Sequence, residues 1–330
     1  LHRDLRRQRQ MCIRDSPEDN ALDKFKFDEK GAEKLRKMGF GTVLSQSGDG
    51  IVRGTGTLIS LTDNDQTQIQ EDKVSSHYAF QKGTSTQSYP SSLMGCIALL
   101  RQYHLDLNYY EEMGGDQNLS LEAGIASQEL PAFFHCKDEL EVLRAQKIGN
   151  EFDQKYIHIG NGDEYQQLQD LEHINYSFIE NGKQNYHEYV LPLNFPKPFD
   201  IEDPFDAMYV SLQDLKHWEI APSNPMLLEQ DGLNFALSGN GLEQASDLLT
   251  NLRTAVSRGL SESMAMNALT VIPAKMLYRD DIGSLDEGKL ANFIITSDDI
   301  INAEGEILEN WVQGDKFEIA PWDIVDIRGT

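Results

Sequence analysis

The chain has 330 residues, and its 54 Asp and Glu residues against 29 Lys and Arg give a formal charge of −25 at pH 7. A protein so acidic repels nucleic acid and anionic membranes, and no apolar run approaches the roughly 18 residues of a membrane span. The three cysteines, Cys12, Cys96 and Cys136, have neither an even count nor a metal-site spacing, which argues against a disulfide framework or a structural zinc. We therefore expect a soluble protein without nucleic-acid or membrane partners.

Residues 1–16 differ from the rest of the chain. They hold five Arg in an otherwise acidic sequence, show no apolar periodicity and do not begin with Met. We interpret them as a non-native or disordered leader, with an authentic basic tail as the alternative. Since such a start hides any export signal that precedes it, the compartment stays unknown.

The next part of the chain combines a few regular elements with polar loops. The glycine-rich stretch 48–56 precedes a strand at 58–61 rather than a helix, so we interpret it as a loop and not as a dinucleotide-binding turn. Residues 62–76 are polar, and 78–89 is a loop rich in Ser and Thr. A buried strand is predicted for 39–44, and helices are predicted for 30–38, 90–113 (as one helix or two) and 119–126.

From Leu130 onward strands and helices alternate regularly. Short apolar runs are separated by amphipathic stretches whose apolar residues recur at helical spacing. Strands that alternate with helices of this length indicate parallel βα units. The predicted strands are 131–135, 155–159, 176–179, 189–193 and 234–237, and the predicted helices are 138–152, 163–171, 212–218 and 222–230.

The stretch from Gly232 to Ile295 has the most specific order of elements. Its strand runs into a polar Ser-Gly-Asn-Gly turn, and two amphipathic helices follow, the second with Ser261 at its N-cap. After these helices come the segments PAKML (273–277) and IGSLDEGKLANFII (282–295).

This order resembles the C-terminal end of the amidohydrolase superfamily, in particular its imidazolonepropionase-like branch. There a T..PA..L helix leads to an IGSLxxGKxADxxx segment, and this chain has Asn292 where the family usually has Asp. The resemblance runs back to about Gly39. It implies an α/β fold, with a partial TIM-type (β/α)8 barrel of the metal-dependent hydrolase type over 17–281, lacking its first strand, and a small C-terminal β-sandwich portion over 282–330.

The resemblance also implies where a catalytic site would lie. Active members hold one or two metal ions with a His-x-His after the first strand, single His residues after the fifth and sixth, and an Asp after the last. The metal lowers the pKa of bound water, and the Asp takes its proton. His135 matches the fifth-strand His and is the candidate ligand for zinc or another divalent metal. The sixth-strand His corresponds to Asn161 or Gly160 and the catalytic Asp to Asn240, while no His-x-His occurs in the chain.

Several of these residues have more than one interpretation. His135 is also explained as a hydrogen-bonded core histidine, and His158 as a packing residue. Cys136 follows His135 on a strand and so points to the opposite face, which argues against a thiol nucleophile beside the histidine. Asn161, His158, Asn194 and Ser238 are the candidates for lining a cleft at the carboxyl ends of the strands, where the chemistry of such barrels lies.

Two functional hypotheses follow. In the first, the chain is a hydrolase of carbon–nitrogen bonds other than peptide bonds, which acts on a small amide-type substrate through metal-activated water. In the second, it is a catalytically inactive, metal-free module that serves as a structural or binding partner of another amidohydrolase module of the same parent. Asn161 and Asn240 separate the two, because Asn carries no charge, cannot take a proton and is a weak ligand for a catalytic metal.

Overall fold

The computed structural model describes residues 17–64, 67–83, 89–114, 117–168, 188–203, 205, 208–301 and 305–322. The predicted leader 1–16 and the predicted strand 176–179 lie outside these ranges. Within them, no helix combines the length and the apolar character that crossing a membrane requires.

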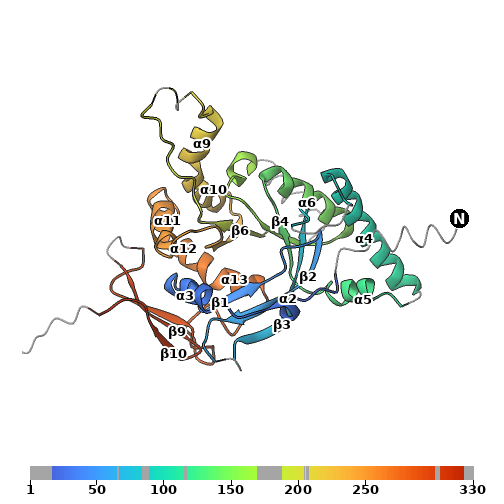
Figure 1. Ribbon diagram of the computed structural model, residues 1–330, viewed down its shortest axis with the longest axis horizontal. Coiled ribbons are helices and arrows are strands. Elements are labelled where there is room, and N and C mark those ends of the chain that lie inside the picture. The colour runs from blue at the N-terminus through green and yellow to red at the C-terminus, as the bar shows by residue number, and fades with distance from the viewer. Residues whose placement is uncertain are drawn as a thin grey trace, which may run out of the picture.

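A seven-stranded mixed sheet forms the centre of the molecule (Figure 1). Its strands lie side by side in chain order; β1 to β3 pair antiparallel, and β3 to β7 pair parallel. The strands are β1 (Thr42–Ser45), β2 (Val52–Ser60), β3 (Ile69–Ala79), β4 (Ala132–His135), β5 (Tyr156–Ile159), β6 (Glu188–Pro192) and β7 (Asn234–Ser238).

The first three strands, β1 to β3, pair antiparallel and so depart from the all-parallel order of a (β/α)8 barrel. Residues 46–51 connect β1 to β2, and residues 61–68 connect β2 to β3. These connections are too short for a parallel crossover, which needs a dozen or more residues. The sheet is also curled, because Leu44 on one edge strand and Ala236 on the other line the same cavity. The described residues therefore form a half-barrel.

Strand β3 corrects the sequence prediction, which had polar residues at 62–76 and a loop from 78. The first half of this strand alternates between exposed and half-buried residues, and only its second half, from Val74, is fully buried. A strand that begins at the protein surface can carry polar residues such as Glu71 and Lys73, and its composition then resembles that of a loop.

The two faces of the parallel strands have different neighbours, because alternate residues point to opposite sides. The outer face lies under α4, α6 and α11, and its residues Tyr78, Phe134, Tyr156, Tyr189 and Phe235 belong to the main core. The inner face carries Phe133, Ile157 and Ala236, which pack with Met276 of α13. The helices are α2 (Ala21–Lys24), α3 (Glu29–Lys37), α4 (Leu93–Met113), α5 (Leu119–Ala126), α6 (Glu139–Phe152), η1 (Glu164–Gln167), α9 (Leu212–Ile220), η3 (Ala221–Ser223), α10 (Asn224–Gln230), α11 (Ser246–Ser257), α12 (Glu262–Leu269) and α13 (Val271–Met276).

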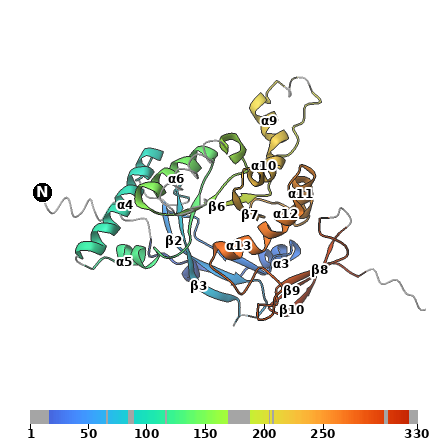
Figure 2. The same cartoon turned by 180° about the vertical axis from the view of Figure 1, so that it is seen from behind.

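The C-terminal segment forms a separate three-stranded antiparallel sheet, β8 (Phe293–Thr296), β9 (Ile307–Val312) and β10 (Asp315–Glu318). It lies at the opposite end of the molecule from α4 and α5 (Figure 2). The resemblance implied a β-sandwich portion, and the described residues contain this single three-stranded sheet; the sandwich stays a prediction. The domain boundary at 281/282 stays a prediction.

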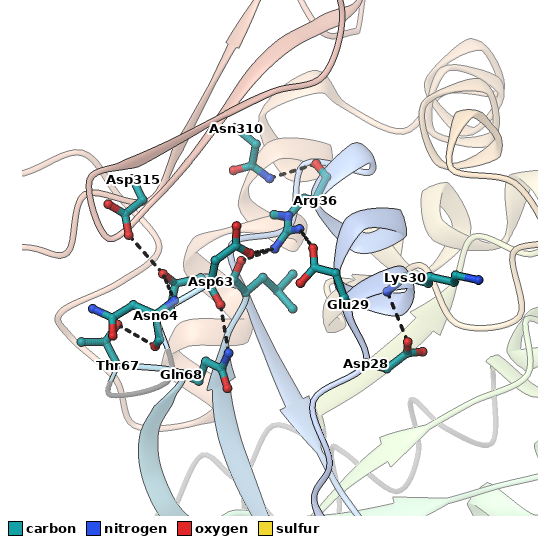
Figure 3. A network of polar contacts seen from close by, with 12 residues as sticks. Asp28, Glu29, Lys30, Arg36, Asp63, Asn64, Thr67, Gln68, Asn310 and Asp315 are labelled. Atoms are coloured by element: carbon teal, nitrogen blue, oxygen red, sulfur yellow. Dashed lines mark hydrogen bonds and ion pairs between the residues drawn. The ribbon is translucent and has the colours of Figure 1, made fainter.

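Hydrogen bonds anchor this small sheet to the N-terminal part of the half-barrel (Figure 3). The amide of Asn310 donates to the carbonyl oxygens of Arg36 and Phe40, both at 2.9 Å. Asn292 donates to Thr42 Oγ1 at 3.1 Å and accepts from the Gln313 backbone N–H at 2.7 Å. The Asn at this position therefore joins β1 to the β9–β10 turn through both ends of its amide.

Candidate functional site

A cavity of about 1170 Å³ lies against the inner face of the curled sheet. Its walls come from segments far apart in the chain, including the region around α3, β1, the ends of β4 to β7, α12 and α13. Most of the lining side chains on the sheet are apolar, among them Phe133, Ile159, Val190 and Ala236. A concave site with apolar walls and few polar groups is the usual form of a small-molecule site.

Two histidines on neighbouring strands are the principal polar groups of this wall. His135 ends β4, as predicted, and its Nε2 lies 3.2 Å from Nδ1 of His77 on β3. Nε2 of His77 in turn lies 2.9 Å from the hydroxyl oxygen of Ser75. Both histidines line the cavity, and the ring of His77 stacks on Phe133. Parallel pairing of β3 with β4 places His77 opposite Phe133, and this register brings the two imidazoles together.

Burial keeps both imidazoles neutral. Burial is the largest cause of the low pKa of His77, which lies well below its usual value, and the neighbouring His135 and the positive charge of Arg53 add to it. Burial together with the charge of Arg53 lowers the pKa of His135 to about 3. At pH 7 each ring therefore carries a single N–H proton.

His77 was missed by the sequence analysis, because residues 62–76 were interpreted as polar and the Ser/Thr-rich stretch from Tyr78 as a loop. The signal that could have revealed it is the buried apolar run Tyr78-Ala79-Phe80 that follows it. Such a run is typical of a buried strand end.

The other predicted site residues divide into two groups. Ser238 and Asn240, at the carboxyl end of β7, line the cavity together with His135. Asn161 and Asn194 are exposed and are not part of its lining. Asn194 instead lies beside the turn after β7, since a Cβ at Gly241 would lie 2.7 Å from its Nδ2.

His158 has a different location from the one predicted for a cleft residue. It is fully buried on the outer face of the sheet, with its ring near those of Tyr156 and Tyr189 in the main core. The period of two along β5 causes this: Ile157 and Ile159 point inward, so His158 points toward the helices. Its position agrees with the packing interpretation.

The place expected for the sixth-strand histidine is filled by a carboxylate. Glu164 is fully buried, and its Oε1 accepts the backbone N–H groups of Asn161 and Gly162 at 3.0 and 3.3 Å. Its Oε2 accepts from the amide of Asn224 at 2.7 Å. A Cβ at Gly160 would lie only 1.7 Å from this carboxylate. A side chain at position 160 would therefore require the Glu164 carboxylate to move.

The described residues do not fit a catalytic metal. Such sites need three protein ligands that converge on one point, and the described ranges contain no group of three or more His, Cys, Asp or Glu side chains that could hold a metal ion. Nε2 of His135 is also engaged by His77, which leaves only Nδ1 as a ligand atom. Among the remaining groups, Ser238 and Asn240 are weak metal ligands.

Comparison with known proteins supports the fold. No protein-family model and no curated protein sequence matches the chain. Among solved structures, an amidohydrolase from Thermotoga maritima superposes with a TM-score of 0.68 at 20% identity, over 92% of this chain and 80% of that one. A 5-methylcytosine deaminase from Klebsiella pneumoniae has a TM-score of 0.43 at 10% identity, over 73% of this chain and 55% of that one. A prolidase has a TM-score of 0.41 at 11% identity, over 72% of this chain and 65% of that one. The likeness to the Thermotoga protein shows a shared fold over most of the chain.

Proposed function

We propose that this chain is an amidohydrolase-type module that binds a small, uncharged, amide-type molecule in the inner-face cavity, without metal-dependent hydrolysis by its described residues. The observation that carries the proposal is a cavity of about 1170 Å³ with apolar walls and a neutral, hydrogen-bonded histidine pair. His135 of this pair is the residue that the resemblance matches to the fifth-strand ligand of the superfamily. The partner we propose is a competent amidohydrolase module of the same parent, and the 282–295 segment supports the imidazolonepropionase-like branch.

A second candidate is a metal-dependent hydrolase of carbon–nitrogen bonds. The fold shared with the Thermotoga amidohydrolase and the position of His135 at the end of β4 favour it. This function needs metal ligands from outside the described residues. It also needs a base to replace Asn240, whose amide cannot take a proton from water.

Zinc titration and ligand binding distinguish the two candidates. We expect the metal-stripped chain to bind no stoichiometric, tight zinc, and to bind the neutral fluorescent probe N-phenyl-1-naphthylamine at one site. Val190→Trp, which fills the cavity, should abolish probe binding. Met94→Trp, on the exposed surface of α4, should not.

Two results would contradict the proposal. Tight stoichiometric zinc that is lost in His135→Ala would favour the hydrolase. Absence of probe binding, or equal binding by Val190→Trp, would remove the cavity as the ligand site.

A further inference from the structure

Three side chains form a hydrogen-bonded relay across the inner face of the sheet. It runs from Ser75 Oγ to His77 Nε2 (2.9 Å) and from His77 Nδ1 to His135 Nε2 (3.2 Å). Ser75 and His77 are fully buried, whereas His135 is half-buried at the cavity. The relay therefore connects a buried hydroxyl to His135, the more exposed of the two imidazoles.

The opposite strand leaves room for this relay. Gly56 of β2 pairs with Ser75, and a Cβ at this position would lie 2.6 Å from Ser75 Oγ and 2.7 Å from His77 Nε2. Both distances are too short for real contacts. Any other residue at position 56 would separate the hydroxyl from the imidazole.

The relay has a preferred direction. With both rings neutral, either Ser75 donates to His77 and His77 donates to His135, or each hydrogen bond runs the other way. In the reversed arrangement the Ser75 hydroxyl hydrogen needs a second acceptor, and the described residues provide no further partner for Ser75 Oγ. A buried donor without an acceptor is costly. The forward arrangement is therefore favoured, and it leaves the proton of His135 on Nδ1.

Nδ1 of His135 is the nitrogen that remains for a ligand, since no hydrogen bond within the described residues uses it. Its surroundings select the kind of acceptor. A neutral N–H in an apolar wall suits a carbonyl oxygen, because the imidazole itself carries no charge that would offset that of an anion. Phe133, two residues earlier on β4, and Ile159, opposite His135 on β5, suit a hydrocarbon ring or chain beside that carbonyl.

We propose that the Ser75–His77 relay fixes His135 as an N–H donor through Nδ1, and that this donor binds the carbonyl oxygen of a lactam or similar uncharged amide in the cavity. Ser75 and His77 are positioning residues in this scheme, and only His135 touches the ligand. The inference rests on the proposed function, because it requires that the cavity binds a small molecule.

The first test is the tautomer of the two rings. Long-range ¹H–¹⁵N spectra of ¹⁵N-histidine-labelled protein should show His77 and His135 with the proton on Nδ1, and variants of each histidine assign the signals. Ser75→Ala removes the hydrogen bond to His77 Nε2 that selects the Nδ1–H form, so the Nε2–H fraction of both rings should rise above that of the wild type. Ser76→Ala removes the same atom from the next residue of β3, on the other face of the sheet, and should change neither ring.

The second test is binding of ε-caprolactam, measured by displacement of N-phenyl-1-naphthylamine. Ser75→Ala should weaken caprolactam about tenfold, the effect of one net hydrogen bond. Its affinity for the fluorescent probe, which has no carbonyl group, should stay within twofold of the wild type, which also checks that the variant folds. Ser76→Ala should bind both molecules like the wild type.

The outcomes separate this inference from the proposed function. The relay would be overturned, and cavity binding would still stand, if the wild-type rings carry their protons on Nε2 or if Ser75→Ala binds caprolactam as tightly as the wild type does. The wild-type spectra test the relay even if Ser75→Ala fails to fold. If the wild type binds neither probe nor lactam, the proposed function fails and the inference falls with it.

Discussion

Arg36 ties three parts of the chain together, and we expect Arg36→Met to lower the free energy of unfolding by about 3 kcal/mol. The guanidinium projects from α3 and is only 5% exposed. Its Nη1 donates to the Leu61 carbonyl and to Asp63, both at 2.9 Å, and its Nη2 donates to Glu29. The group also lies over the ring of Phe317 in β10, 4.2 Å from its centre (Figure 3 shows the polar contacts).

The contacts of Arg36 contribute unequally. Asp63 and Glu29 are 62% and 59% exposed, so each ion pair contributes at most about 1 kcal/mol. The buried hydrogen bond from the charged guanidinium to the Leu61 carbonyl contributes about 1.5–3 kcal/mol. The cation–π contact adds about 0.5–1 kcal/mol. Met recovers part of the apolar packing of the side chain, which brings the expected loss to about 3 kcal/mol.

Urea denaturation of the wild type and two variants tests this reasoning. Lys37→Met is the matched control, because Lys37 follows Arg36 on α3 but pairs with Glu33 in solvent at 2.7 Å. We expect it to stay within about 0.5 kcal/mol of the wild type. An Arg36→Met loss below about 1 kcal/mol, or an equal loss in the control, would refute the assignment of Arg36 as a connection between α3, the β2–β3 loop and the small sheet.

Two further predictions concern the 282–295 segment and the site. Gly283→Ala should lower the melting temperature more than Gly288→Ala. Both glycines have φ of +89°, but only at Gly283 would a Cβ meet the Thr270 carbonyl oxygen, at 2.8 Å. Equal shifts in melting temperature would contradict a role for this close contact. His135 has a folded-state pKa of about 3, below its unfolded value, so its contribution to stability is present above pH 6.5 and is lost as the pH falls. Between pH 7 and pH 5 the wild type should therefore lose about 2 kcal/mol more stability than His135→Asn in urea titrations, whereas parallel losses would mean that His135 titrates normally.

Local patterns predicted the second half of the chain well. The alternation of apolar runs and amphipathic stretches from Leu130 predicted β4 to β7, since burial on both faces makes parallel strands apolar throughout, and it predicted α6, α9 and α10 between them. Within the predicted helix 163–171 the described residues form only the short 3-10 helix η1. The predicted N-cap is confirmed too, with Ser261 accepting from the Met264 backbone at 3.2 Å. These features depend on neighbours within a few residues, so the sequence carries them directly.

The candidate site was predicted only in part. His135 could be selected because it ends a predicted strand, and Ser238 and Asn240 because they lie in the turn directly after one, where the resemblance places the catalytic Asp; all three line the cavity. His158 could be separated from them only by knowing which face of β5 is covered by helices. β3 was missed because its exposed first half has the composition of a loop.

What the sequence determined by itself is the order of elements from Leu130 and the segment at 282–295, because periodicity, caps and turns act locally. What only the tertiary structure decided is the meeting of His77 with His135, which are 58 positions apart in the chain. That contact depends on the register between β3 and β4, and on the absence of a side chain at Gly56 on a third strand. Register and close approach are set by how whole strands pack, so no local pattern encodes them.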